Sequence, residues 1–241
     1  MTSAKPLMLY LPGLDGTGRL LFAQPRLAEA FSLHCHGYPQ TGSQTYRTLA
    51  EEAAQRIQRV RQPNQQSIVL CESFGGGVAI ELAMAFPDCV DRLVLVNTFA
   101  HYPHRLLIRA GAMLSYLLPG RPSPPRSRKH RERFLFADDL PWETRQQWWQ
   151  CVSDVPMSAL GRRIRLISQL DRRDQLKGIQ TPAFVVVSQN DRTVPPSSGE
   201  LLAQRLPNAA MARIGGGHTA MSHPEVDMTG LITEWLDQTS R

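Results

Sequence analysis

Short apolar runs recur along the chain and alternate with segments whose apolar residues lie at helical spacing. Most of the runs are continuously apolar, as expected for strands that are covered on both faces of a sheet. The runs predict six strands, at residues 7–11, 32–36, 68–72, 93–97, 184–188 and 210–214. The helical spacing predicts helices at residues 19–30, 46–61, 76–86, 198–206 and 224–237. This alternation predicts an α/β fold, with a mostly parallel central sheet and helices on both of its faces.

The alternation stops between about residues 101 and 180, where no strand is predicted. An apolar stretch at 106–118 is followed by a Pro- and Arg-rich run at 119–133, which we interpret as an exposed linker. Helical patterns follow around 142–149 and 158–171. Because structureless loops of this length are uncommon in compact domains, we expect a helical cap over residues 101–180. The core of the α/β domain would then comprise residues 1–100 and 181–241.

Composition places the chain among ordinary globular proteins, and its length of 241 residues suits one domain with an insertion. No apolar run approaches the roughly 20 residues that span a bilayer, and the N-terminus lacks the pattern of a secretion signal. The cysteines have no metal-ligand spacing, and we expect free, buried thiols. We therefore predict a cytoplasmic protein.

Positive charge is concentrated in the predicted cap. The chain carries 27 Lys and Arg against 21 Asp and Glu, and the segment from His101 to Gln180 holds fifteen of the former and seven of the latter. A local surplus of this kind argues against a general nucleic-acid binder. The cluster Arg121–Arg133 suits peripheral contact with an anionic membrane surface or with an acidic carrier, and a solvated loop is the alternative interpretation.

The predicted strand at 68–72 leads into Ser73-Phe74-Gly75-Gly76-Gly77, and a helical pattern follows. A serine at a sharp strand-to-helix turn is typical of a nucleophile elbow, in which backbone strain directs the hydroxyl outward. The common pattern is G-x-S-x-G, and Cys71 stands where that pattern has its first glycine. The alternative, a turn that cradles phosphate, is disfavoured because a Walker lysine and a G-x-G-x-x-G pattern are absent. Ser73 is therefore the candidate nucleophile.

Two further residues complete a candidate triad. His218 follows the predicted strand at 210–214, where a base can reach Ser73; His223 competes, but it precedes Pro224 and resembles a residue that begins a helix. Asp191 follows the predicted strand at 184–188 and can orient an imidazole, although aspartate is also common in turns. The order Ser, Asp, His, with each residue after its own strand, favours the catalytic interpretation.

Backbone groups and cap residues supply the rest of the predicted site. The loop after the first strand can place the backbone N–H of Leu14 beside that of Phe74, and together they would form an oxyanion hole. In that loop we interpret Asp15 as a cap of the next helix. Candidates for lining an acyl pocket, with packing between cap helices as the alternative, are Trp142, Trp148 and Trp149, together with Leu106, Leu107, Met113, Leu114, Tyr116 and Leu117.

These segments together resemble the α/β-hydrolase superfamily over nearly the full length of the sequence. More narrowly, LPGLDGTG at Leu11–Gly18 and ESFGG at Glu72–Gly76 are similar to the hydrolase portion of phytyl-ester-synthase and diacylglycerol-acyltransferase-like proteins of plastids and cyanobacteria. Those proteins carry an acyltransferase-type extension, whereas this sequence ends at Arg241, just after the last helical pattern. We therefore expect a stand-alone hydrolase.

The sequence thus predicts a serine hydrolase that cleaves a small-molecule carboxylic ester or thioester through an acyl-serine intermediate. Ser73 would attack the acyl carbon, with His218 as the base and Asp191 orienting it. The scheme needs no metal and no organic cofactor. Three alternatives stay open: transfer of the acyl group to an alcohol such as phytol, a lyase or C–C hydrolase reaction on the same triad, and a non-enzymatic binding protein.

Overall fold

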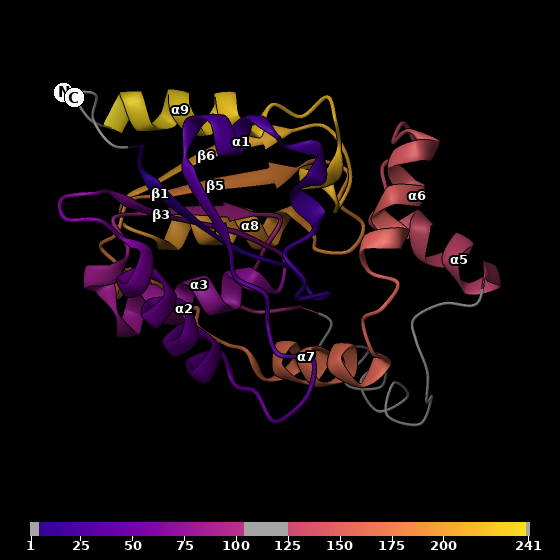
Figure 1. The fold of residues 1–241 in the computed structure, drawn as a ribbon, viewed down its shortest axis with the longest axis horizontal. Helices are drawn as coiled ribbons and strands as arrows, with labels where there is room; N and C mark the ends of the chain where they lie inside the picture. Colours follow the sequence, from indigo (N-terminus) through magenta and orange to yellow (C-terminus); the bar gives the residue numbers. More distant parts are fainter. Residues whose placement is uncertain (1–4, 104–124, 240–241) are drawn as a thin grey trace.

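A six-stranded parallel sheet, in the order β2-β1-β3-β4-β5-β6, forms the centre of the computed structural model, which describes residues 5–103 and 125–239 (Figure 1). All five strand pairs are parallel. The strands are β1 (Leu7–Leu11), β2 (Ser32–Cys35), β3 (Ser67–Glu72), β4 (Arg92–Val96), β5 (Ala183–Ser188) and β6 (Ala209–Ile214). Each lies within one residue of its predicted bounds, so the predicted parallel sheet is confirmed.

Helices cover both faces of this sheet (Figure 1). The helices are α1 (Arg26–Ala30), α2 (Tyr46–Val60), α3 (Gly75–Ala85), α5 (Pro125–Leu135), α6 (Trp142–Cys151), α7 (Met157–Gln169), α8 (Pro196–Arg205) and α9 (Met228–Thr239). Successive strand residues point to opposite faces: Leu9 and Leu11 join the buried cluster on the side of α2, α3 and α8, whereas Met8 and Tyr10 join the cluster on the side of α1 and α9.

Three of the helices predicted outside the inserted segment begin at least two residues away from their predicted start. The segment predicted as one helix at 19–30 contains a 3-10 turn at Leu20–Ala23 and then α1, because Pro25 has no N–H to continue a ladder. Helix α8 begins two residues early, at Pro196. Helix α9 begins at Met228, four residues late, where Asp227 Oδ1 accepts a hydrogen bond from the Gly230 N–H at 2.9 Å and so caps the first turn.

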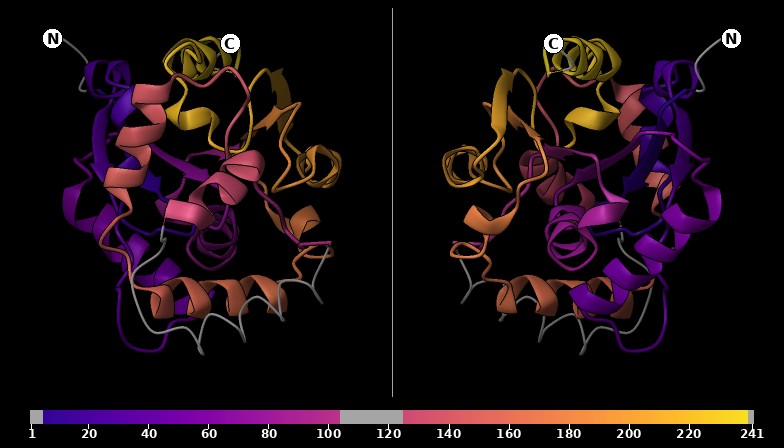
Figure 2. Two further views of the ribbon diagram at one scale, coloured as in Figure 1. Left: turned by 90° about the vertical axis from the view of Figure 1, so that its right-hand side faces the viewer. Right: turned by 90° about the vertical axis from the view of Figure 1, so that its left-hand side faces the viewer.

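Helices α5, α6 and α7 lie around the edge of the sheet at which the strands end, and the left view of Figure 2 looks onto this edge. The predicted exposed linker at 119–133 is wrong in its second half, because α5 begins at Pro125, a residue suited to the first helical position, and continues to Leu135. Phe136, the residue after α5, packs with Trp148 and Trp149 in a third buried cluster. Residues 104–124 lie outside the described residues, and with them the pocket candidates Leu106, Leu107, Met113, Leu114, Tyr116 and Leu117.

Among the described residues, the inserted segment forms no strand beyond an isolated bridge between His101 and Asp171. This bridge brings together the two points at which the chain leaves and re-enters the sheet. Within residues 5–103 and 125–239, none of the helices has the length and apolar character that crossing a bilayer would demand. All four cysteines are free, but only Cys71 and Cys89 are buried as predicted. Cys151 is half-buried, and Cys35 is exposed because it ends β2, which lies at the sheet edge.

Candidate active site

Ser73 lies at the sharp turn between β3 and α3 and has a φ of 49°, in the left-handed region that non-glycine residues rarely adopt. Backbone hydrogen bonds hold this conformation: the Ser73 N–H donates to the Val96 carbonyl at 3.1 Å, and the Thr98 hydroxyl donates to the Ser73 carbonyl at 2.5 Å. A strained residue held in this way is characteristic of functional sites. The geometry is the one that the sequence predicted for a nucleophile elbow.

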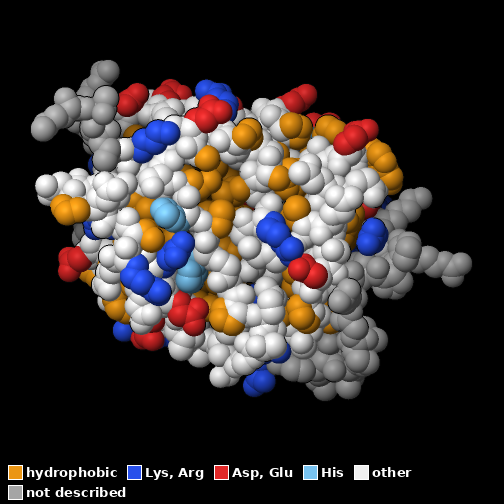
Figure 3. All heavy atoms as spheres, viewed as in Figure 1, with side chains coloured by type: hydrophobic (Ala, Val, Ile, Leu, Met, Phe, Trp, Pro, Cys, Tyr) orange, Lys and Arg blue, Asp and Glu red, His pale blue; other side chains and the backbone are white. Residues whose placement is uncertain are grey.

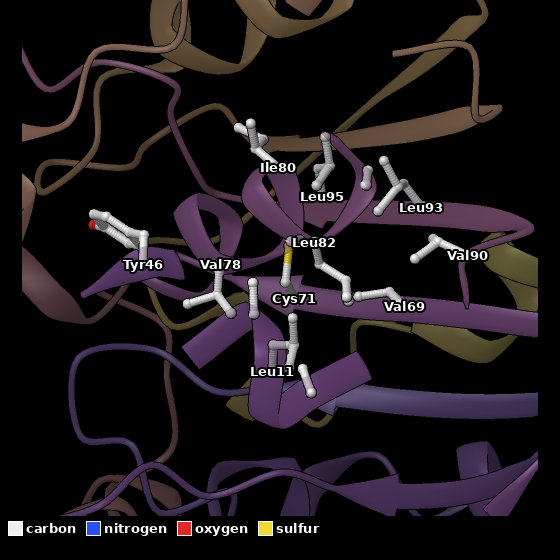
Figure 4. Packing of buried hydrophobic residues seen from close by; sticks show 14 of the residues in the cluster. Leu11, Tyr46, Val69, Cys71, Val78, Ile80, Leu82, Val90, Leu93 and Leu95 are labelled. Atoms are coloured by element: carbon white, nitrogen blue, oxygen red, sulfur yellow. The ribbon is translucent and has the colours of Figure 1, made fainter. Parts of the chain in front are cut away.

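The residues around Ser73 are small because β3, α3 and the end of β1 pack closely. A Cβ atom at Gly75 would lie 2.4 Å from the Leu11 carbonyl oxygen, so no side chain fits there. Cys71 is fully buried among Val69, Leu82 and their neighbours (Figure 4), and its Sγ lies 3.5 Å from the Val94 carbonyl oxygen. This apolar setting accepts a thiol in place of the glycine of the common pattern.

The three predicted polar residues meet at the ends of three strands. His218 Nε2 lies 3.0 Å from Ser73 Oγ, and His218 Nδ1 lies 2.8 Å from Asp191 Oδ2. The second oxygen of Asp191, Oδ1, accepts hydrogen bonds from the backbone N–H groups of Thr193 and Val194, each at 2.8 Å. A hydroxyl, an imidazole and a carboxylate are thus arranged in one hydrogen-bonded line, an order that can support nucleophilic catalysis by the serine.

The rival histidine, His223, lies outside this line. Its Nδ1 accepts a hydrogen bond from the Glu225 N–H at 3.3 Å, and its Nε2 lies 3.6 Å from Asp139 Oδ1. The described contacts therefore favour His218 as the partner of Ser73, in agreement with the sequence interpretation.

Glu72, the residue before Ser73, is a buried carboxyl group that sequence reasoning took only for the end of a strand. It accepts a hydrogen bond from the Tyr10 hydroxyl at 2.5 Å. Burial raises the pKa of Glu72 to about 7, against the opposing effect of the Tyr10 hydrogen bond. A charged residue type at the end of an otherwise apolar strand was the signal available in the sequence, because glutamate is rarely buried.

Charge around His218 shifts its affinity for a proton. Burial disfavours the protonated ring, but the Asp191 carboxylate attracts and hydrogen-bonds it, and Glu72 adds a further negative charge; as a result the pKa of His218 lies above its ordinary value. The arrangement therefore favours the protonated, imidazolium form of His218.

Asn97, directly after β4, is a second residue that the sequence interpretation missed. It has a φ of 45°, and its side-chain amide donates to the Ser188 hydroxyl at 2.8 Å and to the His218 carbonyl at 3.0 Å. Its Oδ1 accepts a hydrogen bond from the Ser188 N–H at 2.8 Å. Asn97 therefore ties the ends of two strands to the loop that carries His218. The signal in the sequence was its position, since, like Ser73, it directly follows a buried strand.

The two predicted oxyanion groups are available for a ligand. Within the described part of the chain, neither the Leu14 N–H nor the Phe74 N–H donates a hydrogen bond to another residue. The predicted role of Asp15 as a helix cap is wrong: its Oδ2 accepts from the Thr17 N–H at 2.7 Å and closes a turn, whereas the following 3-10 element has no side-chain cap.

A cavity of about 540 Å³ opens beside Ser73 and His218. Its lining is mainly apolar, and the part that comes from α6, α7 and the segment between them includes Trp148, Trp149, Val152, Val155, Met157, Leu160, Ile164 and Ile167. Of the three predicted tryptophans, Trp148 and Trp149 line the cavity, and their ring centroids lie 4.9 Å apart in an edge-to-face arrangement. The prediction for Trp142 is wrong, because this residue is 63% exposed and lies outside the cavity lining. A cavity of this size and character suits a small apolar ligand group.

On the face seen in Figure 3, Lys and Arg side chains lie scattered among Asp and Glu. Among the residues that the structure describes, no group of three His, Cys, Asp or Glu side chains is placed to hold a metal ion.

Comparison with known proteins agrees with this geometry. The family described as "Alpha/beta hydrolase family" matches residues 9–227. Phytyl ester synthase 2 of Arabidopsis thaliana chloroplasts is 31% identical over 49% of this chain, but the match covers only 17% of that longer protein. A putative carbamate hydrolase, RutD of Yersinia enterocolitica, is 25% identical over 97% of this chain and 88% of its own length.

The fold has close counterparts among solved structures. A thermophilic esterase from Thermogutta terrifontis superimposes with a TM-score of 0.82 at 21% identity, over 98% of this chain and 91% of that esterase. At this level of identity the likeness concerns the fold, in agreement with the sheet order and the helices described above.

Proposed function

The chain belongs to the α/β-hydrolase family, and we propose that it is a serine hydrolase that cleaves a carboxylic ester or thioester through an acyl-serine intermediate. The observation that carries this proposal is the continuous line from Ser73 through His218 to Asp191, with separations of 3.0 and 2.8 Å. The names of two relatives also support it: one is a phytyl ester synthase and the other a putative carbamate hydrolase.

In the first step, His218 Nε2 takes the proton from the Ser73 hydroxyl as Ser73 Oγ attacks the acyl carbon. Asp191, held by two backbone N–H groups, keeps the ring in the tautomer that can accept this proton. The imidazolium then protonates the departing alkoxide or thiolate, which leaves the acyl group on Ser73. Water, deprotonated by the same ring, attacks the acyl-serine and releases the acid.

Negative charge develops on the carbonyl oxygen in both steps. We assign its stabilisation to the backbone N–H groups of Leu14 and Phe74, which make no other hydrogen bond among the described residues. The Phe74 N–H stands at the start of α3, where the helix dipole also favours negative charge.

The acyl group would occupy the apolar cavity beneath α6 and α7. In this proposal residues 101–180 act as the cap of the site, and Trp148 and Trp149 form part of its wall. Membrane contact by the basic segment Arg121–Arg133 stays a prediction, since part of that segment lies outside the described residues.

A panel of p-nitrophenyl esters and acyl thioesters of increasing chain length tests this proposal, with Ser73→Ala as the negative control. We expect turnover by the natural protein and none above background by Ser73→Ala. Equal rates for the two proteins would contradict it.

Acyl transfer to an alcohol is a second candidate, favoured by the partial similarity to phytyl ester synthase 2 and by the apolar cavity. It differs only in the acceptor that reaches the acyl-serine. Product analysis with a long-chain alcohol added to the assay distinguishes the two: a new ester supports transfer, and free acid alone supports hydrolysis.

A further inference from the structure

Arg163, on α7, is a charged side chain buried completely inside the protein. It is the bulkiest of the fully buried side chains among the described residues. Burying a guanidinium is costly unless it is well hydrogen-bonded, and burial indeed lowers the pKa of Arg163, while the charge of Asp15 opposes this effect. The contacts of this buried guanidinium are therefore of interest.

The guanidinium holds two loops of the core. Its Nη1 donates to the carbonyl oxygens of Leu14 at 2.9 Å and of Asp15 at 2.8 Å, and its Nη2 donates to the Pro39 carbonyl at 3.0 Å. The loop also leaves space for it, because Gly16 has a φ of 65° and a Cβ there would lie 2.6 Å from Arg163 Cζ. The contact thus requires both the Arg163 guanidinium and a glycine at position 16 of the loop.

The loop that Arg163 holds is the one that carries the Leu14 N–H. Hydrogen bonds fix the loop on each side of this donor: the Gly13 carbonyl accepts from the Gly16 N–H at 3.1 Å, and the next carbonyl, that of Leu14, accepts from Arg163. A small displacement of an oxyanion donor lowers the rate strongly, because the stabilisation requires correct distance in the transition state.

The same helix also lines the cavity. Leu160, Ile164 and Ile167 of α7 face it, at spacings that place them on one side of the helix. Arg163 lies between Leu160 and Ile164 in sequence and reaches the oxyanion loop from the same helix. An acyl group that packs against α7 therefore touches the element that positions the loop.

We propose that Arg163 is a positioning residue through which binding of the acyl group against α7 sets the oxyanion loop. This inference rests on the function proposed above. It adds that the length of the substrate's acyl chain affects the chemical step through α7 and Arg163. Binding energy from a part of the substrate remote from the reacting carbon is then realised in turnover rather than in affinity alone. In the natural protein kcat should rise with acyl length until the α7 face is covered.

The test compares kcat and KM for p-nitrophenyl acetate and p-nitrophenyl octanoate in the natural protein, Arg163→Met and Arg165→Met. Arg165 is exposed on the same helix, so its variant removes the same charge without touching the loop. For Arg163→Met we expect kcat on the octanoate to fall about 10- to 100-fold, less than or equal to the lower end of the roughly 10²- to 10³-fold loss for removal of a whole oxyanion donor, because the donor is displaced and not deleted. The ratio of kcat on octanoate to kcat on acetate should fall toward one, while the ratio of the KM values is kept. Arg165→Met should behave as the natural protein.

An equal loss of kcat on both esters, with the ratio kept, would overturn the proposal, because a merely structural role predicts that result. Circular dichroism and thermal unfolding check that each variant folds. If Arg163→Met does not fold, Arg163→Lys takes its place, since it keeps the charge but not the paired donors. This variant should partially lower the ratio of kcat on octanoate to kcat on acetate, and an unchanged ratio would again overturn the proposal. Labelling of Ser73 by a fluorophosphonate distinguishes failure of this inference from failure of the proposed function. If Ser73 is labelled but the octanoate-to-acetate ratio of kcat is unchanged in the variant, only the coupling through Arg163 is refuted. If Ser73 of the natural protein is not labelled, the proposed function is refuted.

Discussion

His218 Nδ1 lies 2.8 Å from Asp191 Oδ2, and these two side chains keep only 9% and 1% of their surface exposed. The other oxygen of Asp191 is held by two backbone N–H groups from the following turn. The backbone therefore holds the carboxylate in place independently of its contact with the imidazole. Its position leaves Nε2, the opposite ring nitrogen, facing Ser73.

Replacement of Asp191 by asparagine should leave the fold intact and lower kcat by about 10⁴-fold, the effect that such a substitution has in serine proteases. The amide would favour the tautomer whose Nε2 carries the proton, and that ring cannot accept the proton of Ser73. Steady-state kinetics on a p-nitrophenyl ester measures the loss. Turnover near that of the natural protein would mean that another carboxylate orients His218.

Glu72 should affect the pH dependence of turnover. His218 must be neutral to act as a base, so kcat/KM rises as pH passes its pKa, which lies above the ordinary value. The Glu72 carboxylate contributes to that raised pKa, and Glu72→Gln removes its charge while keeping an acceptor for the Tyr10 hydroxyl. The acid limb of the profile should therefore move to lower pH. A limb that stays in place or moves to higher pH would contradict this electrostatic coupling.

Glu72 should also make stability depend on pH. Its pKa is about 7 in the folded state against 4.5 for an ordinary glutamate, so its contribution to stability is most favourable below pH 4.5 and is lost as pH rises through 7. The Glu72→Gln variant should therefore be more stable than the natural protein at pH 8, by at most about 3 kcal/mol. Urea unfolding at pH 8 and pH 5 measures this difference. A gain that is the same at both values would rule out titration of Glu72 as its cause.

Asn97 should be needed for both stability and turnover. Asn97→Gly tests the side chain alone, because glycine adopts the observed φ of 45° without strain. The variant leaves the buried Ser188 N–H and the His218 carbonyl without their partner, at a cost of about 1–3 kcal/mol for each unsatisfied group. We expect a lower free energy of unfolding and at least a tenfold lower kcat. Asn208→Ala, at an exposed position, is the matched control.

The sheet, and the meeting of Ser73, Asp191 and His218 at one edge of it, could be predicted because their signals are local. Buried parallel strands appear as continuous apolar runs, and Ser73, Asp191 and His218 each follow such a run closely. The carboxyl ends of parallel strands meet at one edge, so three separate positions in the sequence converge there. The order of the residues was sufficient, without knowledge of any distance.

Other features depend on partners that are distant in sequence. Glu72 meets a tyrosine 62 positions away, and Asn97 contacts a backbone carbonyl 121 positions away. Arg163 lies in the run Gly-Arg-Arg-Ile-Arg, in which nothing local distinguishes the buried arginine from its neighbours Arg162 and Arg165. Such residues become visible only when tertiary packing decides which side chain is enclosed.

The most direct test of the account is intact-protein mass spectrometry after reaction with a fluorophosphonate, followed by mapping of the modified peptide. We predict one adduct per chain, located on Ser73, in the natural protein and none in Ser73→Ala. Asp191→Asn should react much more slowly at the same serine, because His218 can no longer activate it efficiently. The absence of an adduct on natural, folded protein, or an adduct on another serine that persists in Ser73→Ala, would contradict the central claim that Ser73 is the nucleophile.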